Sequence, residues 1–330
     1  MNDRLASTSD FLLELYSDAA DCHPEAFRLR TLERLTKLID FDFAVWGGGA
    51  AESRDVTDLV TYEQSPEILY DWSQVADQDA FCDITLGQLG KAARFDDIRN
   101  YRDSIAYNDH WRRFGARQMM ATISAEPLDG YVSFVGLCSE ARTNVFCDAS
   151  RMMKNVIVPH LSAALRINRQ SSLMRHGRES EAIGLVDRGG WILVGLDRFS
   201  ELAREEGALS NRLPHGMWEG LVQTGAWQGT ALLASAERRG AHYLVRLTPL
   251  GAFARLTPRE MEIVRSYVTG LTFREIATEL AIAPSTVRNH IANIFEKLHV
   301  ASRTELVQLH LATFGQFTAP DTPKAPGASP

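Results

Sequence analysis

The sequence predicts a multidomain protein with an α/β unit first, a short α+β segment after it, and an all-α unit of four helices last. The chain has 330 residues, which is long for a single domain, and 45% of them are hydrophobic, enough for several cores. Strand-like and helical patterns alternate up to residue 250, whereas residues 251–316 show only helical patterns. We therefore expect separate domains in series.

The first domain is expected to cover residues 1–147. Its paired strands meet at an Asp129-Gly130 turn, a dipeptide typical of hairpins. This order of elements resembles, in architecture, α/β sensors of the GAF-like or autoinducer-domain type. The expected elements are helices at about 4–20 and 24–39, strands FDFAVWG and DLVTYE, helices near 66–88 and 103–114, and strands RQMMATISAEP and YVSFVGLCSE.

Aromatic side chains in this domain are candidates for an apolar pocket with a few polar anchors, although filling the core is the alternative role of each. Acyl-homoserine-lactone receptors carry a Trp, a Tyr four residues on, an Asp nine further and then a Pro. Tyr70 and Asp79 match one interval, but Pro66 and Ala80 replace the Trp and the Pro. We therefore expect another small apolar or aromatic effector. The candidate ligand-binding residues are Trp46, Tyr62, Tyr70, Trp72, Asp79 and Trp111.

Two segments are expected to join this domain to the last one. Residues 148–177 predict a connector helix bent at Pro159, which either packs on its own domain or forms a dimer seam. Residues 178–250 follow the order hairpin, helices, hairpin, which resembles a shortened PAS-like domain. The last residues, 317–330, are rich in Pro, Ala and small polar residues and are expected to be disordered.

Capping signals divide residues 251–316 into four short helices. Thr257 with Glu260 forms one capping box and Thr272 with Glu275 forms another, each beside a hydrophobic staple. Gly270, which lies between the two boxes in the sequence, is expected to end the first helix. A third box, Ser302 with Glu305, opens the fourth helix, whereas Ala283 leaves the third without a side-chain cap.

The third helix of this unit, in APSTVRNHIANIFEKLHV, has one apolar and one polar face. Its apolar residues recur at helical spacing and predict the buried stripe Val287, Ile291, Ile294 and Leu298. Arginine donates two hydrogen bonds to guanine and asparagine pairs with adenine, so the opposite face has the side chains that read base edges. That face is Arg288, Asn289, Ala292, Asn293 and Glu296.

The blocks LTPRE, GLTFREIATEL, STVRNHIANIFEKL and RTEL resemble, in order and spacing, the helix-turn-helix DNA-binding domain of LuxR-type (LuxR/GerE) transcriptional regulators. PHLSAALRI is similar to the joining helix of members with two sensory modules. The resemblance implies base reading by Arg288, Asn289 and Ala292, with Asn293 as the substitute where Ala292 is too short. It implies backbone contacts by Thr286, His290, Lys297 and Arg303.

The lack of net positive charge lowers the DNA affinity that we expect of one copy. The whole chain has a net charge of −7, and residues 256–314 contain six basic and six acidic residues. Phosphate neutralisation supplies most non-specific affinity, so a neutral domain gains from binding two half-sites. The expected partners are therefore double-stranded operator DNA and a second copy in a homodimer. The candidate pocket adds a small-molecule effector, and the resemblance to LuxR-type regulators implies RNA polymerase.

Other classes find less support. The scattered cysteines, the polar N-terminus and the lack of a long apolar run favour a cytoplasmic protein without a membrane segment. No metal-ligand or nucleophile signature is present, so no enzyme activity, metal or cofactor is expected. The alternative is a regulator controlled by phosphorylation or by a partner, as in response regulators, but the chain opens with two helices where a receiver domain opens with a strand.

Overall fold

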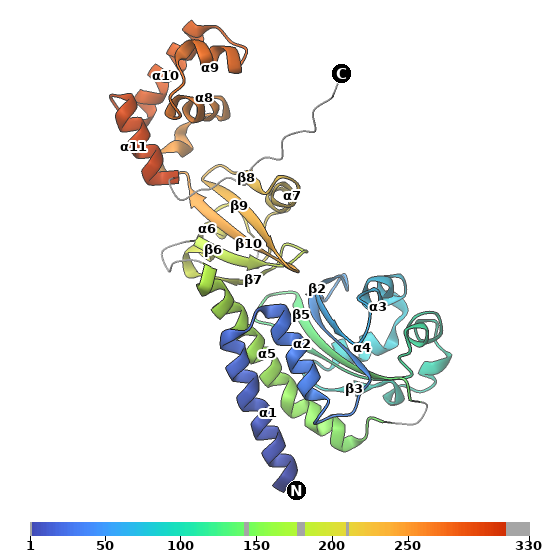
Figure 1. Ribbon diagram of the computed structural model, residues 1–330. Helices are drawn as coiled ribbons and strands as arrows, with labels where there is room; N and C mark the ends of the chain where they lie inside the picture. Colours follow the sequence, from blue (N-terminus) through green and yellow to red (C-terminus); the bar gives the residue numbers. More distant parts are fainter. Residues whose placement is uncertain (1, 142–144, 177–181, 209–210, 315–330) are drawn as a thin grey trace, which may run out of the picture.

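Figure 1 shows the computed structural model, which describes residues 2–141, 145–176, 182–208 and 211–314. Two sheets with their helices lie one after the other, and a bundle of short helices follows at the far end. The expected disordered segment 317–330 lies outside the described residues. Within the described chain no helix is both long enough and apolar enough to cross a bilayer.

The first sheet has five strands in the order β2-β1-β5-β4-β3, and each pairing is antiparallel. The expected hairpins lie in it, but the central position of β5 between β1 and β4 could not be deduced from hairpin signals. The two-residue strand β3 was not expected. The strands are β1 Phe43–Ala50, β2 Val56–Tyr62, β3 Ala93–Arg94, β4 Gln118–Ala125 and β5 Tyr131–Ser139.

Both faces of this sheet are covered. Alternate residues of β1 point to opposite sides, and because the run is apolar, each side has hydrophobic side chains to bury. Phe43 and Val45 belong to the hydrophobic cluster on one face, Ala44 and Trp46 to the cluster on the other. The second face packs on α1 Asn2–Asp21, α2 Pro24–Leu35 and α5 Asp148–His176. The first face packs on α3 Glu67–Tyr70, η1 Asp71–Gln74, η2 Ala76–Gln78, α4 Ala80–Gly87, η3 Phe95–Asp97, η4 Tyr101–Asp103, η5 Ala106–His110 and η6 Trp111–Phe114.

Helix α5 is the long helix that connects the two sheets, and it continues through Pro159. A buried lysine fixes it under the first sheet: Lys154 Nζ donates to the carbonyl oxygens of Met120 and Val135 at 2.9 and 2.6 Å. Burial lowers the pKa of this amine well below its usual value. Leu173, near the C-terminal end of α5, packs against the second sheet.

The second sheet repeats the strand order of the first, as β7-β6-β10-β9-β8. Apolar residues of α6 and α7, including Phe199 and Met217, cover one of its faces. The short strand β8 was not expected from the sequence. The elements are β6 Ala182–Val186, β7 Ile192–Gly195, α6 Asp197–Glu205, α7 His215–Thr224, β8 Ala226–Gln228, β9 Leu232–Arg239 and β10 His242–Pro249.

The final unit is a bundle of four short helices preceded by the turn η7 Gly251–Arg255. Leu233 of β9 belongs to the same buried cluster as Phe253 and Phe314, so the second sheet packs against this bundle. Arg265 also donates to the side-chain oxygen of Gln228 at 2.8 Å. The helices are α8 Pro258–Val268, α9 Phe273–Glu279, α10 Pro284–Leu298 and α11 Arg303–Phe314.

Candidate nucleic-acid interface and effector cavity

Local capping residues set the geometry of α8, α9 and α10. The two capping boxes expected at Thr257 and Thr272 are both formed. In each box the Glu side chain, of Glu260 or Glu275, accepts a hydrogen bond from the backbone amide of the capping Thr. Helix α10 begins at Pro284, which has no N–H, and the Thr286 amide donates to the Ala283 carbonyl at 3.0 Å, so this helix end has no side-chain cap. Such an end attracts a phosphate.

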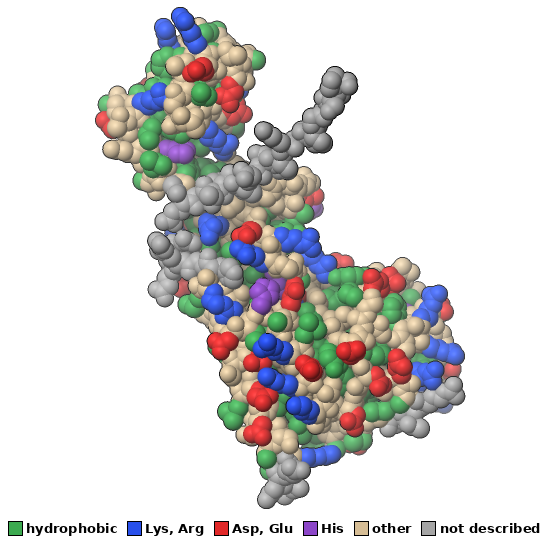
Figure 2. All heavy atoms as spheres, viewed as in Figure 1, with side chains coloured by type: hydrophobic (Ala, Val, Ile, Leu, Met, Phe, Trp, Pro, Cys, Tyr) green, Lys and Arg blue, Asp and Glu red, His purple; other side chains and the backbone are tan. Residues whose placement is uncertain are grey.

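The polar face of α10 is exposed and its apolar stripe is buried. Val287, Ile291, Ile294 and Leu298 are at most 5% exposed. Figure 1 places α9 and α10 at the end of the molecule away from the sheets, and Figure 2 shows Lys and Arg side chains projecting from that end. The exposed residues are Arg288, Asn289, Ala292, Asn293 and Glu296, whereas Thr286 and His290 are half-buried at the margins.

Lys297 has an internal partner that the sequence analysis did not foresee. Its ammonium donates to both carboxylate oxygens of Glu260, at 2.8 and 2.7 Å, and the Glu260 side chain is only 5% exposed. Burial alone would raise the pKa of Glu260, but hydrogen bonds from Lys297 and Thr257 outweigh it and lower the pKa. In the structure this ion pair joins α10 to α8, and the phosphate contact expected of Lys297 stays a prediction.

Arg303 is likewise engaged within the bundle. Its guanidinium donates to the carbonyl oxygens of Tyr267 and Leu271 and lies 4.4 Å from the centre of the Tyr267 ring. Tyr267 lies in the last turn of α8 and Leu271 just after it, at the end of the helix where carbonyl groups lack the intrahelical partners of the interior. Arg303 thus holds the C-terminal end of α8, and the phosphate contact expected of it stays a prediction.

One basic residue on the neighbouring helix was missed. Arg274 is exposed on α9, the helix that crosses the DNA backbone in a helix-turn-helix. Arg288 lies 5.9 Å from the ring centre of Phe273, at the start of the same helix. The signal was available in the sequence, because the first helix of the motif holds a single arginine in its first turn.

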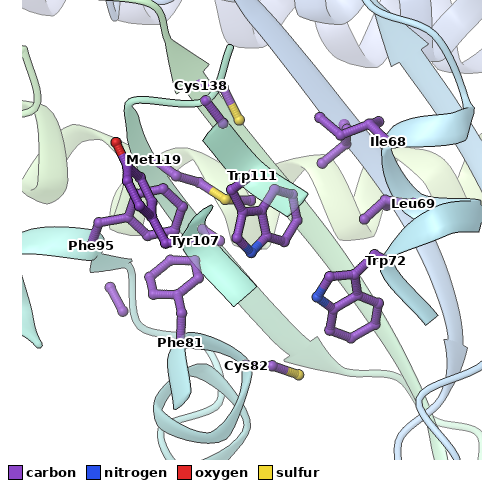
Figure 3. Close-up of a cluster of buried hydrophobic side chains, with 14 of the residues drawn as sticks. Ile68, Leu69, Trp72, Phe81, Cys82, Phe95, Tyr107, Trp111, Met119 and Cys138 are labelled. Carbon is purple, nitrogen blue, oxygen red and sulfur yellow. The ribbon is translucent and has the colours of Figure 1, made fainter. Parts of the chain in front are cut away.

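A cavity of about 80 Å³ lies between the first sheet and the short helices that cover it, and it opens partly to solvent. Figure 3 shows the aromatic and sulfur-containing side chains of the cluster that surrounds it. The strands contribute Val45, Val56, Met119, Ala121, Ile123, Phe134 and Gly136. The helices and turns contribute Leu69, Trp72, Asp79, Phe81, Cys82, Thr85 and Trp111.

Asp79 joins the helices above the cavity. It is fully buried, and its Oδ2 accepts from the indole nitrogens of Trp72 and Trp111, both at 2.9 Å. Its Oδ1 accepts from the Tyr101 hydroxyl at 2.7 Å and from the Phe81 amide at 3.0 Å. In Figure 3 the two indole nitrogens turn toward one region beside Phe81. With four donors already bound, Asp79 positions the cavity wall and has little capacity left for a ligand.

Three of the expected ligand-binding residues do not line this cavity. Trp46 is 1% exposed on the opposite face of the sheet, beside Phe27, because its neighbours in the strand point the other way. Tyr62 packs on Phe41 on that same face. Tyr70 is 39% exposed at the surface. Trp72, Asp79 and Trp111 do line the cavity.

The exposed polar face of α10, carried on capped short helices, defines a helix-turn-helix DNA-binding unit. Residues 254–310 match the family described as bacterial regulatory proteins, luxR family. The chain therefore has a LuxR-family DNA-binding domain at its C-terminal end.

Known regulators are similar over this region. The regulator GfsR of Streptomyces halstedii is 42% identical over 64 residues, covering 19% of this chain and 26% of GfsR. MalT of Vibrio cholerae is 38% identical over 65 residues, 20% of this chain and 6% of MalT. An HTH-type transcriptional regulator of Mycobacterium bovis is 38% identical over 89 residues, 25% of this chain and 10% of that protein. The matched region is thus a small part of each relative.

Solved structures show distant similarity. The VqsR ligand-binding domain from Pseudomonas aeruginosa aligns with a TM-score of 0.38 and 18% identity, covering 49% of this chain and 96% of that one. SdiA from Escherichia coli aligns with a TM-score of 0.33 and 14% identity, over 93% of this chain and 98% of its own.

Proposed function

We propose that the chain is a transcription regulator that binds operator DNA as a homodimer and responds to a small, largely apolar or aromatic effector in the first sheet's cavity. The observation that carries DNA binding is the exposed row Arg288, Asn289 and Asn293 on the uncapped helix α10. Thr286, His290 and Ala292 complete the proposed surface, with Arg274 added from α9.

The proposed dimerisation rests on the charge balance of the DNA-binding domain. Six basic residues are balanced by six acidic ones over residues 256–314, and Lys297 and Arg303 are engaged internally. One domain then neutralises few phosphates, so a specific site is expected to be a repeat of two half-sites bound by two copies. Contact with RNA polymerase and action in the cytoplasm belong to the same proposal.

The effector site is supported by the chemistry of the cavity wall. Apolar and aromatic side chains form most of it, and the carboxylate of Asp79 is saturated by groups of the protein. A ligand without a charged headgroup fits this wall best. We propose the following division of the chain: a GAF-like sensor over 1–147, the connector over 148–177, a PAS-like domain over 178–250 and the DNA-binding domain over 251–316. The shared strand order of the two sheets supports two related sensory domains.

DNA binding is tested by selecting sites from random duplexes with the full chain. An enriched inverted repeat that yields a dimer-sized complex is the expected result. A complex with one copy on a single half-site would contradict the dimer, and selection of no sequence at all would contradict the operator.

Effector binding is tested with toluene as a probe that matches the apolar wall. At a hundredfold excess over its dissociation constant, the probe should stabilise the folded chain by about 2.7 kcal/mol, seen as a rise in melting temperature. Ala121→Leu fills the cavity from β4 and should remove the rise. A rise that survives this change would place the probe elsewhere, and a response to a phosphodonor alone would favour the response-regulator alternative.

A further inference from the structure

The turn between β6 and β7 of the second sheet contacts two segments that line the cavity of the first. The Thr57 hydroxyl donates to the Asp187 carboxylate. The Arg188 guanidinium donates to the Tyr70 hydroxyl and lies 5.2 Å from the centre of its ring. Thr57 follows the cavity residue Val56 in the chain, and Tyr70 follows the cavity residue Leu69. Both contacts are thus one residue away from the cavity wall.

A β-bulge in β2 gives Thr57 its direction. Val56 pairs with Gly49 and Asp58 pairs with Gly48, so Thr57 is an extra residue on the edge strand of the sheet. A bulge re-aims side chains, which explains why Val56 meets the cavity while Asp58, two residues on, meets helices on the other face. The Asp55 carbonyl oxygen approaches so closely that a Cβ at Gly49 would lie 1.8 Å from it. The bulge therefore fixes the relative orientations of the Val56, Thr57 and Asp58 side chains.

Asp187 organises the turn that receives Thr57. One carboxylate oxygen accepts from the amides of Gly189 and Trp191, each at 2.9 Å, and the other accepts from Thr57. The turn fits closely, since a Cβ at Gly189 would lie 2.4 Å from the Thr57 methyl carbon. Trp191 packs on Tyr131 of β5, with ring centres 5.3 Å apart. A change in the position of Thr57 therefore displaces Asp187 and the backbone that it holds.

The second sheet connects this turn to the DNA-binding domain. Strand β6 pairs with β10 along its length, and β10 pairs with β9. Leu233 of β9 and Leu250 after β10 are buried in the cluster that contains the core of the helix bundle. One end of this sheet thus contacts the cavity segments and the other end contacts the bundle (Figure 1).

We propose that Asp187 and Arg188 respond to occupancy of the cavity through Thr57 and Tyr70, so that the second sheet domain transmits the effector signal to the DNA-binding domain. This rests on the proposed effector cavity. A ligand against Val56 and Leu69 restrains both segments, and that restraint changes the stability of the turn bonded to them.

The test measures hydrogen exchange of the full chain at residues 182–195, which include the Gly189 and Trp191 amides held by Asp187. The cavity is perturbed in two ways, by toluene and by Ala121→Leu, with the smaller Ala121→Val used if the leucine variant does not fold. The double variant Thr57→Val with Tyr70→Phe removes both hydroxyls that contact the turn. The control, Thr61→Val with Tyr62→Phe, makes the same chemical changes in β2 away from the turn.

The wild-type chain and the control are expected to change exchange at the turn by about fivefold or more when the cavity is perturbed. The Thr57/Tyr70 double variant is expected to lose this response while residues 81–86 and 119–123 around the cavity still respond. A turn that responds equally in that variant, or that never responds while the cavity segments do, overturns the proposal. Toluene could leave exchange in the cavity segments unchanged while the Ala121 variants still change exchange at the turn. That result would contradict the proposed effector cavity and support the coupling.

Discussion

Arg288 is the residue on which the proposed base recognition depends most directly. It is exposed in the second turn of α10, and its guanidinium is free of ion pairs among the described residues. Arg288→Ala should cost about 1–3 kcal/mol of specific binding and relax the preference at one base pair per half-site. Arg198→Ala, a surface change of equal charge on α6, is the control. An unchanged preference in site selection would show that Arg288 does not read a base.

Lys297 and Glu260 give a second prediction at the same scale. Lys297→Ala leaves a buried carboxylate without its cation and should destabilise the bundle by about 1–3 kcal/mol, measured by chemical denaturation. Because the pKa of Glu260 is lowered in the folded chain, its contribution is present above the unfolded pKa, near 4.3, and is lost as pH falls through the folded value. Lys297→Ala should therefore flatten the loss of stability in acid.

The salt dependence of DNA binding separates this role from a phosphate contact. If Lys297 served only a phosphate, its replacement would reduce the salt slope by about one unit per half-site and leave stability unchanged. Arg198→Ala, which removes an exposed pair with Glu201 on α6, controls for lost surface charge.

Sequence reasoning succeeded for residues whose partners are three or four positions away. The boxes at Thr257 and Thr272 and the missing cap at Ala283 follow from local spacing, and the structure contains them. The pairing of Lys297 with Glu260 joins positions 37 residues apart. No local rule specifies such a pair, so an amphipathic helix alone could not distinguish a cation held inside from one available to DNA.

At the scale of elements, the cavity is covered by short helices that a single carboxylate holds together. Asp79 caps α4 and binds donors from η1, η4 and η6. Burial, followed by the nearby charge of Asp79, raises the pKa of Tyr101 above its usual range, so Tyr101 remains a donor to that carboxylate. These helices are too short to be stable alone, and the shared acceptor compensates for their length.

Asp79→Ala is therefore expected to disrupt this cover. It leaves four buried donors without an acceptor and should lower the melting temperature of the ligand-free chain, with a loss of about 3–5 kcal/mol. Asp83→Ala, on the same helix but exposed and paired with Arg54, should have little effect. A ligand-free melting point that stays unchanged in Asp79→Ala would mean that Asp79 is a ligand anchor instead.

The elements themselves were largely predictable because period and turn signals are local. The stretch 66–88 was expected to be helical, and it forms α3, η1, η2 and α4. The two faces of β1 were harder to assign. Its run is buried throughout, so hydrophobicity did not indicate which of Val45 and Trp46 meets the cavity. That choice depends on which helices cover each face, which is tertiary information.

At the scale of the whole molecule, one buried carboxylate joins parts of the chain that are far apart in sequence. Asp58 of β2 accepts from Arg28 of α2 at 2.7 Å and from Arg169 of α5 at 2.6 Å. His242 of β10, in the second sheet, lies 3.2 Å from it. The cluster links the first sheet, its helices and the second sheet, and none of these partners was predictable from local spacing.

This cluster predicts that the two sheets unfold together. Burial on its own would raise the pKa of Asp58, but the interactions with Arg28, His242 and Arg169 outweigh it and hold the pKa well below its usual range. The stabilisation is therefore fully present above the unfolded pKa of Asp, about 3.9, and is lost only as pH falls through the much lower folded value. Asp58→Asn leaves Arg28 and Arg169 buried without a counter-charge at any pH.

In calorimetry, Asp58→Asn should cost about 3–5 kcal/mol and should separate one shared transition of the two sheets into two. Asp55→Asn changes the same charge at an exposed position just before β2 and should preserve the single transition. Two transitions already present in the wild-type chain would mean that the cluster does not couple the sheets. If Asp58→Asn instead melts as the wild type does, the arginines find other partners and Asp58 is not the residue that joins them.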